Sequence, residues 1–267
     1  MGFSVVSNIA SANAQANLHV SQNGLQKAMA RLSSGYRINM SGDDSAGLAV
    51  ANKYRNDQAI LNQGVRNAND GLSKLQIKDG ALANISSLLD RMATLATQAA
   101  NAASDADITK LSAEYASVVT EIDREAAVAG MTASAGFSVF VSSESTATNG
   151  KVTGTIAGVE VADLAITQTT FATVAQAETA VSQVKTAIST LGGVQNTVGT
   201  LQNRLQFAIS LSQSQAVNTQ AAESRIRDAN VAEESANMTR FNILSQAGLA
   251  ALAQANQSTS SVLSLLR

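Results

Sequence analysis

Apolar residues recur every three or four positions through most of the chain, which is the spacing of one face of an α-helix. Three stretches sustain this spacing over several heptads, as the seams of coiled coils do. The first stretch contains Leu75, Leu82, Ile85, Leu89, Met92 and Leu95. The second contains Ile108, Leu111, Tyr115, Val118 and Ile122. The third contains Val181, Val184, Ile188, Leu191, Val194, Val198, Leu201 and Leu205, with a slip at Gly192–Gly193. These patterns predict long helices that pack against one another.

Helical spacing continues at both ends of the chain, in segments without charge. Residues 1–26 and 241–266 contain no Asp, Glu, Lys or Arg. The apolar positions that we expect to pack between the two terminal helices are Leu18, Leu25, Leu32, Phe241, Leu244, Leu252, Val262 and Leu266. Ordering a residue costs about 1–2 kcal/mol, which either segment alone buries too little surface to offset. We expect both ends to be disordered in the free chain and helical once packed.

One internal segment has a different character. Residues 130–172 are rich in β-branched residues, Ser and Thr, and contain Asn149-Gly150, a favoured two-residue hairpin turn. The predicted fold is mainly α: a long antiparallel coiled-coil helical rod with a small β-hairpin insertion and paired N- and C-terminal helices. The expected parts are a terminal helix and turn (1–42), two long helices (43–129), the β segment (130–172), a second rod helix (173–222) and a second terminal helix (223–267).

The stretch "SSGYRINMSGDDSAGLAV" (33–50) gathers most of the groups that suggest chemistry. It is not a phosphate loop, since no second glycine is followed by Lys and Ser or Thr. Asp43 and Asp44 make a poor metal site, because neighbours on a helix point about 100° apart and no third acidic ligand is near. Carboxylates are common at helix N-termini, where they accept exposed N–H groups. We therefore interpret this stretch as a turn followed by a helix start.

Composition narrows the function classes further. The net charge is −2 and Lys and Arg are scattered, which argues against nucleic-acid binding. The chain has no Cys and a single His, His19, so disulfides, thiolate metal sites and two-histidine zinc motifs are excluded. We interpret His19 as a packed or solvent-facing helix residue rather than a catalytic base, and we expect neither an enzyme nor a cofactor. The longest apolar run near the C-terminus, Ala247 to Ala253, is too short to span a bilayer, so we expect no membrane insertion.

Two regions carry a resemblance to a known family. The segment beginning "LQKAMARLSSGYRINMSGDDSAGLAVANKYRND" (25–82) resembles the N-terminal region of bacterial flagellin. The segment beginning "SRIRDANVAEESANMTRFNILSQAG" and ending "VLSLLR" (224–267) is similar to its C-terminal region, and "EIDREA" (121–126) fits as well. The resemblance implies a structural subunit that polymerises into the helical flagellar filament for motility. It also implies terminal helices lining an inner tube, heptad helices in an outer tube, and a middle segment facing solvent.

The same resemblance implies a set of partners and a location. These are other copies of the chain, the flagellar export apparatus, an export chaperone, the filament cap and hook-junction proteins. The filament is extracellular, and export needs no cleaved signal peptide. The absence of proline fits long helices and rapid folding after passage in an unfolded state. A host innate immune receptor is a further implied partner, with its epitope matched by Arg91, Leu95 and Glu114.

Two groups of residues complete the prediction. We hypothesise that charged and glycine residues fix the bend between inner and outer helices and contact neighbouring subunits: Arg31, Gly35, Arg37, Asp43, Asp44 and Arg55. A Ser/Thr cluster is a candidate for glycosylation: Ser142, Ser143, Ser145, Thr146 and Thr148. Alternative interpretations are a hook–filament junction protein and a non-polymerising coiled-coil adaptor. Junction proteins often carry proline after the paired aspartates, so Ser45 favours flagellin.

Overall fold

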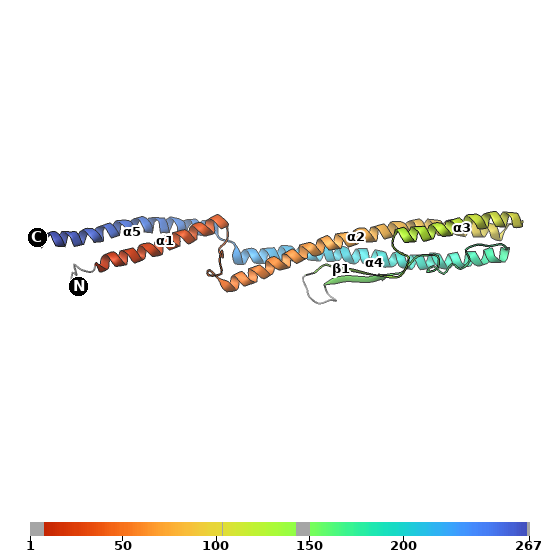
Figure 1. Cartoon of the computed structure of the whole chain (residues 1–267), viewed down its shortest axis with the longest axis horizontal. Helices are drawn as coiled ribbons and strands as arrows, with labels where there is room; N and C mark the ends of the chain where they lie inside the picture. Colours follow the sequence, from red (N-terminus) through yellow and green to blue (C-terminus); the bar gives the residue numbers. More distant parts are fainter. Residues whose placement is uncertain (1–7, 103, 143–149, 266–267) are drawn as a thin grey trace. The chain divides into compact units, whose positions relative to one another are not determined.

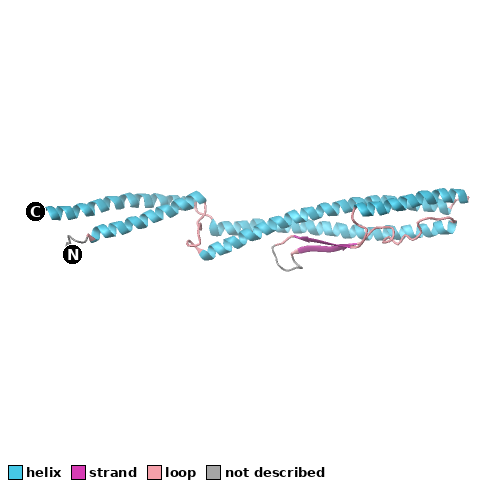
Figure 2. Ribbon diagram, viewed as in Figure 1, coloured by secondary structure: helices cyan, strands magenta, loops and turns pink. Residues whose placement is uncertain are grey.

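A computed structural model describes residues 8–102, 104–142 and 150–265 of the 267, with side chains described up to residue 258. The described chain is mainly α, with a small antiparallel hairpin, which confirms the predicted fold class (Figures 1 and 2). The elements follow in the order α1 (Ile9–Ser34), α2 (Ser45–Ala100), α3 (Asp105–Val128), β1 (Ala135–Phe140), β2 (Lys151–Ile156), α4 (Val174–Arg227) and α5 (Val231–Leu265).

The chain divides into two compact units. The terminal unit comprises Met1–Asn56 and Asn218–Arg267, and the core unit comprises Asp57–Val217. Both divisions fall inside helices, within α2 and α4, rather than at a loop. The part boundaries expected from sequence, 42/43 and 222/223, lie near the start of α2 at Ser45 and the end of α4 at Arg227.

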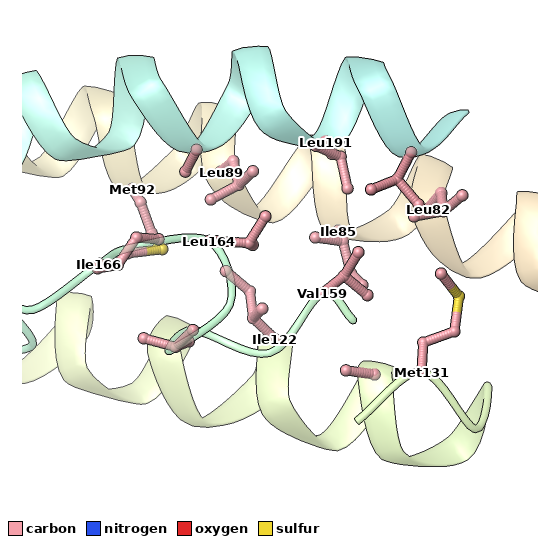
Figure 3. Packing of buried hydrophobic residues seen from close by; sticks show 14 of the residues in the cluster. Leu82, Ile85, Leu89, Met92, Ile122, Met131, Val159, Leu164, Ile166 and Leu191 are labelled. Atoms are coloured by element: carbon pink, nitrogen blue, oxygen red, sulfur yellow. The ribbon is translucent and has the colours of Figure 1, made fainter. Parts of the chain in front are cut away.

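Helices α2, α3 and α4 build the hydrophobic core of the core unit (Figure 3). Every seam position predicted for α2 is buried, from Leu75 to Leu95. On α3 the residues Ile108, Tyr115 and Ile122 are buried, whereas Leu111 and Val118 pack at its edge. α4 contributes buried side chains from Val184 to Leu205, and it continues as helix through Gly192–Gly193. The sequence periodicity thus identified the core-facing side of each helix.

The loop between β2 and α4 closes this core. Figure 3 shows Val159, Leu164 and Ile166 of the loop pointing in among side chains of α2 and α3. Asp123 of α3 anchors the loop, because its Oδ1 accepts a hydrogen bond from the Val161 N–H at 2.9 Å. The three apolar loop residues are 0–3% exposed, so the loop belongs to the core rather than to the surface.

Tyr115 lies at the centre of this packing. Its ring meets Phe171 edge-on, with centroids 5.1 Å apart and an interplanar angle of 64°. The side chain is fully buried, and its hydroxyl has no hydrogen-bond partner among the described residues. Burial penalises the charged phenolate and raises the pKa of Tyr115 to about 12.

The hairpin pairs Phe140 with Lys151, and Val141 N–H donates to Gly150 O at 2.9 Å. The predicted two-residue turn at Asn149-Gly150 is therefore wrong, because it would place residue 148 opposite Lys151. Asn149 itself lies outside the described residues. The observed register turns Val152 toward the core, and this burial selects the pairing over the local turn preference.

Helices α2 and α4 hold the hairpin through small residues and polar contacts. A Cβ on Gly64 of α2 would lie 2.5 Å from the Val141 carbonyl oxygen, so only glycine admits the strand end here. Ser212 of α4 donates from Oγ to the same carbonyl at 2.8 Å. Along the outer edges, Arg204 Nη1 donates to Thr153 O at 2.9 Å, and Asn67 Nδ2 donates to Phe140 O at 3.4 Å.

Candidate functional site: the joint and the terminal helix pair

The stretch that attracted attention in the sequence forms a turn between α1 and α2. We call this turn, together with the end of α1 from Arg31 and the facing residues 226–234, the joint (residues 31–44 and 226–234). α1 ends at Gly35, whose φ of 76° is left-handed and whose N–H donates to Arg31 O at 2.8 Å. A residue with a Cβ is strained in this conformation, so glycine is the suitable helix terminator. Gly35 O then accepts from Ala229 N–H at 2.9 Å, and Arg37 N–H donates to Arg227 O at 2.6 Å.

The two aspartates of the joint are helix and turn caps. Asp44 Oδ1 accepts from Gly47 N–H at 2.8 Å, which makes Asp44 the N-cap of α2. Asp43 Oδ2 accepts from the N–H groups of Asn39 at 3.2 Å and Met40 at 3.3 Å. The hydrogen bond from Asn39 is the main reason that the pKa of Asp43 lies below its usual value. The expectation that a carboxylate caps the helix start is confirmed for Asp44, whereas Asp43 caps the preceding turn.

Arginines connect the joint to the C-terminal half of the terminal unit. Arg31 Nη1 lies 3.0 Å from Glu234 Oε1, an ion pair that is 29% and 10% exposed at its two side chains. Arg37 Nη2 donates to Ile226 O at 2.7 Å. The Arg227 guanidinium stacks 4.1 Å above the ring centroid of Tyr36, a cation–π geometry. Arg55, by contrast, is exposed on α2 and is not part of this network.

Helices α1 and α5 lie side by side, as expected for the terminal helices (Figure 1). They bury remarkably little within one chain: Ala28 is the buried residue described in α1, and Glu234 is the one described in α5. Leu18, Leu25, Leu32, Phe241 and Leu252 are half-buried between them. Leu244 is 46% exposed, so in the single chain it is a surface residue rather than a core residue. The side chains of Val262 and Leu266 lie outside the described residues.

Large apolar side chains are instead displayed on the outside of this pair. They are Ile9, Val20, Met29, Val231, Ile243, Leu244 and Leu249, each at least 46% exposed. A groove of about 440 Å³ runs along both helices, with Ala14, Asn17 and Ser21 on one wall and Gly248 and Ala251 on the other. The terminal pair therefore offers a largely uncharged, apolar surface that no described element of its own unit covers.

The remaining predicted sites lie in the core unit. Arg91 and Glu114 form an exposed ion pair between α2 and α3, whereas Leu95 is 1% exposed inside the core. These three residues thus do not form one surface patch in the folded chain. Of the glycosylation candidates, Ser142 is described and half-buried; Ser143, Ser145, Thr146 and Thr148 lie outside the described residues.

Most polar side chains of the joint bond to one another or to nearby backbone groups, whereas Arg227 Nε is buried without a hydrogen-bond partner among the described residues. In the described part of the chain, no group of three or more His, Asp or Glu residues could hold a metal ion. None of the described helices combines the length and the apolar character that a membrane span requires. Fold and surface together define a mainly helical protein with an exposed apolar face on its α1–α5 pair.

Comparison with known proteins gives the family. The pattern for the bacterial flagellin N-terminal helical region matches residues 5–136, and that for the bacterial flagellin C-terminal helical region matches residues 174–266. A flagellin of Halalkalibacterium halodurans is 36% identical, over 97% of this chain and 98% of its own. The flagellar filament 33 kDa core protein of Treponema phagedenis is also 36% identical, with the same coverage. The chain belongs to the bacterial flagellin family.

A solved structure was also found. The crystal structure of Bacillus cereus flagellin aligns with a TM-score of 0.48 and 31% identity, over 59% of this chain and 94% of that one.

Several residues of the joint and the helix pair were not identified from sequence. Glu234, Ile226 and Arg227 are the distant partners of Arg31, Arg37 and Tyr36 in the joint. Asn8 contacts the far end of α5, donating from Nδ2 to Ala255 O at 3.0 Å. Such partners are 189 to 247 residues apart along the chain, so no local pattern reveals them. Gly24 did leave a signal, since it is a glycine in the interior of a predicted helix.

Proposed function

We propose that this chain, a structural subunit of the bacterial flagellar filament, polymerises by burying the apolar outer face of the α1–α5 pair against other copies of itself. The observation that carries the proposal is the contrast within that pair: its large apolar residues are exposed, and its buried described residues are one alanine and one glutamate. A subunit that joins others by a heterologous contact forms an open helical fibre rather than a closed ring.

The energetics favour order upon assembly. Burying a Val, Leu, Ile or Met side chain completely contributes about 1.5–3 kcal/mol. The seven exposed apolar residues of the pair contribute little of this within one chain, yet holding the backbone of each residue in a helix costs about 1–2 kcal/mol. The pair is therefore marginal alone and stabilised by neighbours. Its uncharged ends also fit a crowded interior, where an unpaired charge is costly.

The joint supplies the second part of the proposal. Arg31, Arg37, Asp43 and Asp44 fix the turn that follows α1 through the contacts described above. Arg55 is exposed next to this region and available for a contact with a neighbouring subunit. The predicted division into terminal helices, rod helices and a β segment on the outside fits the same scheme.

Family membership motivates the remaining partners. We extend the proposal to secretion through the flagellar export apparatus without a cleaved signal, to a chaperone on the C-terminal region, and to cap and hook-junction proteins at the filament ends. Recognition by an innate immune receptor is the weakest of these proposals, because Leu95 is buried. Binding of a receptor ectodomain to soluble subunits, compared with an Arg91→Ala variant, tests it.

Electron microscopy of purified protein after a heat–cool cycle tests polymerisation directly. We expect long, uniform filaments; short caps would indicate a junction protein, and dispersed particles a non-polymerising adaptor. Limited proteolysis should remove both chain ends from soluble subunits and spare them in filaments. Ends protected equally in both states would contradict ordering upon assembly.

Substitutions in the joint test its part separately. Arg31→Ala and Asp43→Ala should leave the core unit folded, as judged by urea unfolding, and reduce filament yield. Arg66→Ala is the matched control, since its described contacts are with Gln63 on its own helix. Normal filament yield from both variants would show that these joint residues are not needed for polymerisation.

A further inference from the structure

The ring of Phe241 of α5 packs against α1 at Gly24. A Cβ placed on Gly24 would be 2.6 Å from Cε1 and Cζ of the ring and 2.8 Å from Cδ1. Real Cβ atoms essentially never approach other atoms this closely. Any residue with a side chain at position 24 therefore displaces the Phe241 ring from its place.

Gly24 is an unfavourable residue for its local structure, which makes its presence informative. It lies in the interior of a 26-residue helix, where glycine is the poorest former after proline. Other helical glycines of this chain, such as Gly80 and Gly192, have nothing within 4 Å of the place of a Cβ. At Gly24 the missing side chain is instead the space that the aromatic ring occupies.

The surrounding contacts all agree on one alignment of the two helices. Seven residues forward from Gly24 and seven backward from Phe241 are Arg31 and Glu234, the ion pair at 3.0 Å. In the other direction, Leu18 lies against Gly248, whose added Cβ would be 3.7 Å from the Leu18 Cβ. An ion pair between long side chains tolerates a shift, whereas a ring seated in a backbone notch does not.

We infer that Gly24 and Phe241 form a matched notch and knob that sets the register of α1 on α5, and that filament growth requires this register. The second half rests on the proposed function. A shift by one helical turn moves facing residues by about 5.4 Å. The walls of the groove, Ala14 and Ser21 on α1 and Ala251 on α5, would then no longer face each other, and another copy would meet a different surface.

Engineered cysteines report the register independently of polymerisation. The chain has no native cysteine. In a Leu18→Cys/Gly248→Cys variant, the Cβ separation of 3.7 Å falls in the range of disulfides, about 3.5–4.5 Å. The rate of disulfide formation under mild oxidation is measured in soluble subunits and in assembled material. Three chains that carry the cysteine pair are compared: one that retains Gly24, one with Gly24→Ala, and one with Gly24→Ala/Phe241→Ala.

We expect Gly24→Ala to slow disulfide formation about tenfold, as overpacking at one site does. Removing the ring in the double variant should restore most of the rate, which a general loss of helix stability would not do. Gly80→Ala is the matched control and should leave the rate unchanged. In the cysteine-free chain, Gly24→Ala should raise the critical concentration for polymerisation about tenfold, with the same rescue.

Three outcomes overturn the inference. The first is that the Leu18→Cys/Gly248→Cys variant that retains Gly24 forms no disulfide in soluble subunits or in assembled material. The others are that Gly24→Ala leaves the rate of disulfide formation unchanged, or that Phe241→Ala does not restore it. A disulfide that responds as expected in a chain that forms no filaments would uphold the register assignment and refute the proposed function. The two claims therefore fail separately.

Discussion

The terminal unit and the core unit are built from the same kind of long amphipathic helix, yet they treat their apolar side chains in opposite ways. In the core unit, Leu82, Ile85 and Leu89 of α2 are all 0% exposed, enclosed by α3, α4 and the loop before α4. In the terminal unit, Ile243 and Leu249 of α5 are 60% and 55% exposed. The difference is one of partners: a helix with two neighbours and a covering loop closes a core, and a helix with one neighbour leaves a face open.

That difference separates stability from assembly. Residues of the core unit should control whether the chain folds, and residues on the open face of the terminal pair should control whether chains join. Four predictions test this separation, in order of decreasing effect.

The largest effect is expected in the core unit. Leu89→Ala removes a fully buried side chain and should lower the free energy of unfolding by about 2–5 kcal/mol in urea. Ile77→Ala on the same helix is the control, since Ile77 is 64% exposed, and should change it by about 0.5 kcal/mol or less. Similar losses from both variants would show that burial in the structure does not govern stability.

The second effect depends on pH. The pKa of Tyr115 is raised to about 12 in the folded chain, and that of an unfolded tyrosine is about 10. Because the pKa of Tyr115 is higher in the folded chain than in the unfolded one, its contribution to the free energy of unfolding is fully present below pH 10. This contribution is lost as the pH rises toward 12. Between pH 10 and pH 12 the free energy of unfolding of the parent chain should fall by about 2–3 kcal/mol more than that of Tyr115→Phe. Tyr54→Phe serves as control, and an identical pH dependence in all three chains would contradict the assignment.

The third prediction concerns the open face. Leu249→Ser should leave urea unfolding of the core unit unchanged and raise the critical concentration for polymerisation about 10–100-fold, through loss of about 1.5–3 kcal/mol of burial. The critical concentration is measured by sedimenting the polymer and determining the concentration of chain that stays soluble. Gln246→Ser, at an exposed polar position of the same helix, should have little effect. If Leu249→Ser instead destabilises the core unit, stability and assembly are not separate.

The smallest effect is expected at the helix cap. Asp44→Ala removes the acceptor for Gly47 N–H and should reduce stability by about 1 kcal/mol, whereas Asp44→Ser keeps an acceptor and should recover most of it. Helix content by circular dichroism during thermal unfolding measures both variants. Equal values for Ala and Ser would show that the cap contributes nothing.

Sequence reasoning was most successful where a single helix determines the answer. The α2 seam was predicted residue by residue, because burial repeats with the helical period. The start of α2 and the turn at Gly35 were also predicted, since caps and left-handed glycines depend on local geometry. The hairpin register was not predicted, because the packing of Val152 against the core outweighed the turn preference of Asn-Gly.

Of the joint in the candidate site, only the N-terminal half was predicted from sequence. Arg31, Arg37 and the aspartates were singled out from their local pattern, but the partners of the two arginines, Glu234 and Ile226, come from the other end of the chain. Leu95 was placed in a surface epitope by resemblance, although its heptad position already put it in the core. Leu244 shows the reverse case, since helical periodicity marks an apolar face without saying which molecule covers it.

The hairpin has a consequence for how such a subunit avoids the wrong kind of assembly. A free strand edge invites pairing with the strands of other chains, which leads to disordered aggregates. Here Arg204 of α4 occupies the Thr153 carbonyl on the outer edge of β2, and Asn67 of α2 approaches the Phe140 carbonyl on the outer edge of β1. Two side chains from the helices thus restrict strand-to-strand contacts, and a filament subunit thereby gains protection against joining other chains through its sheet.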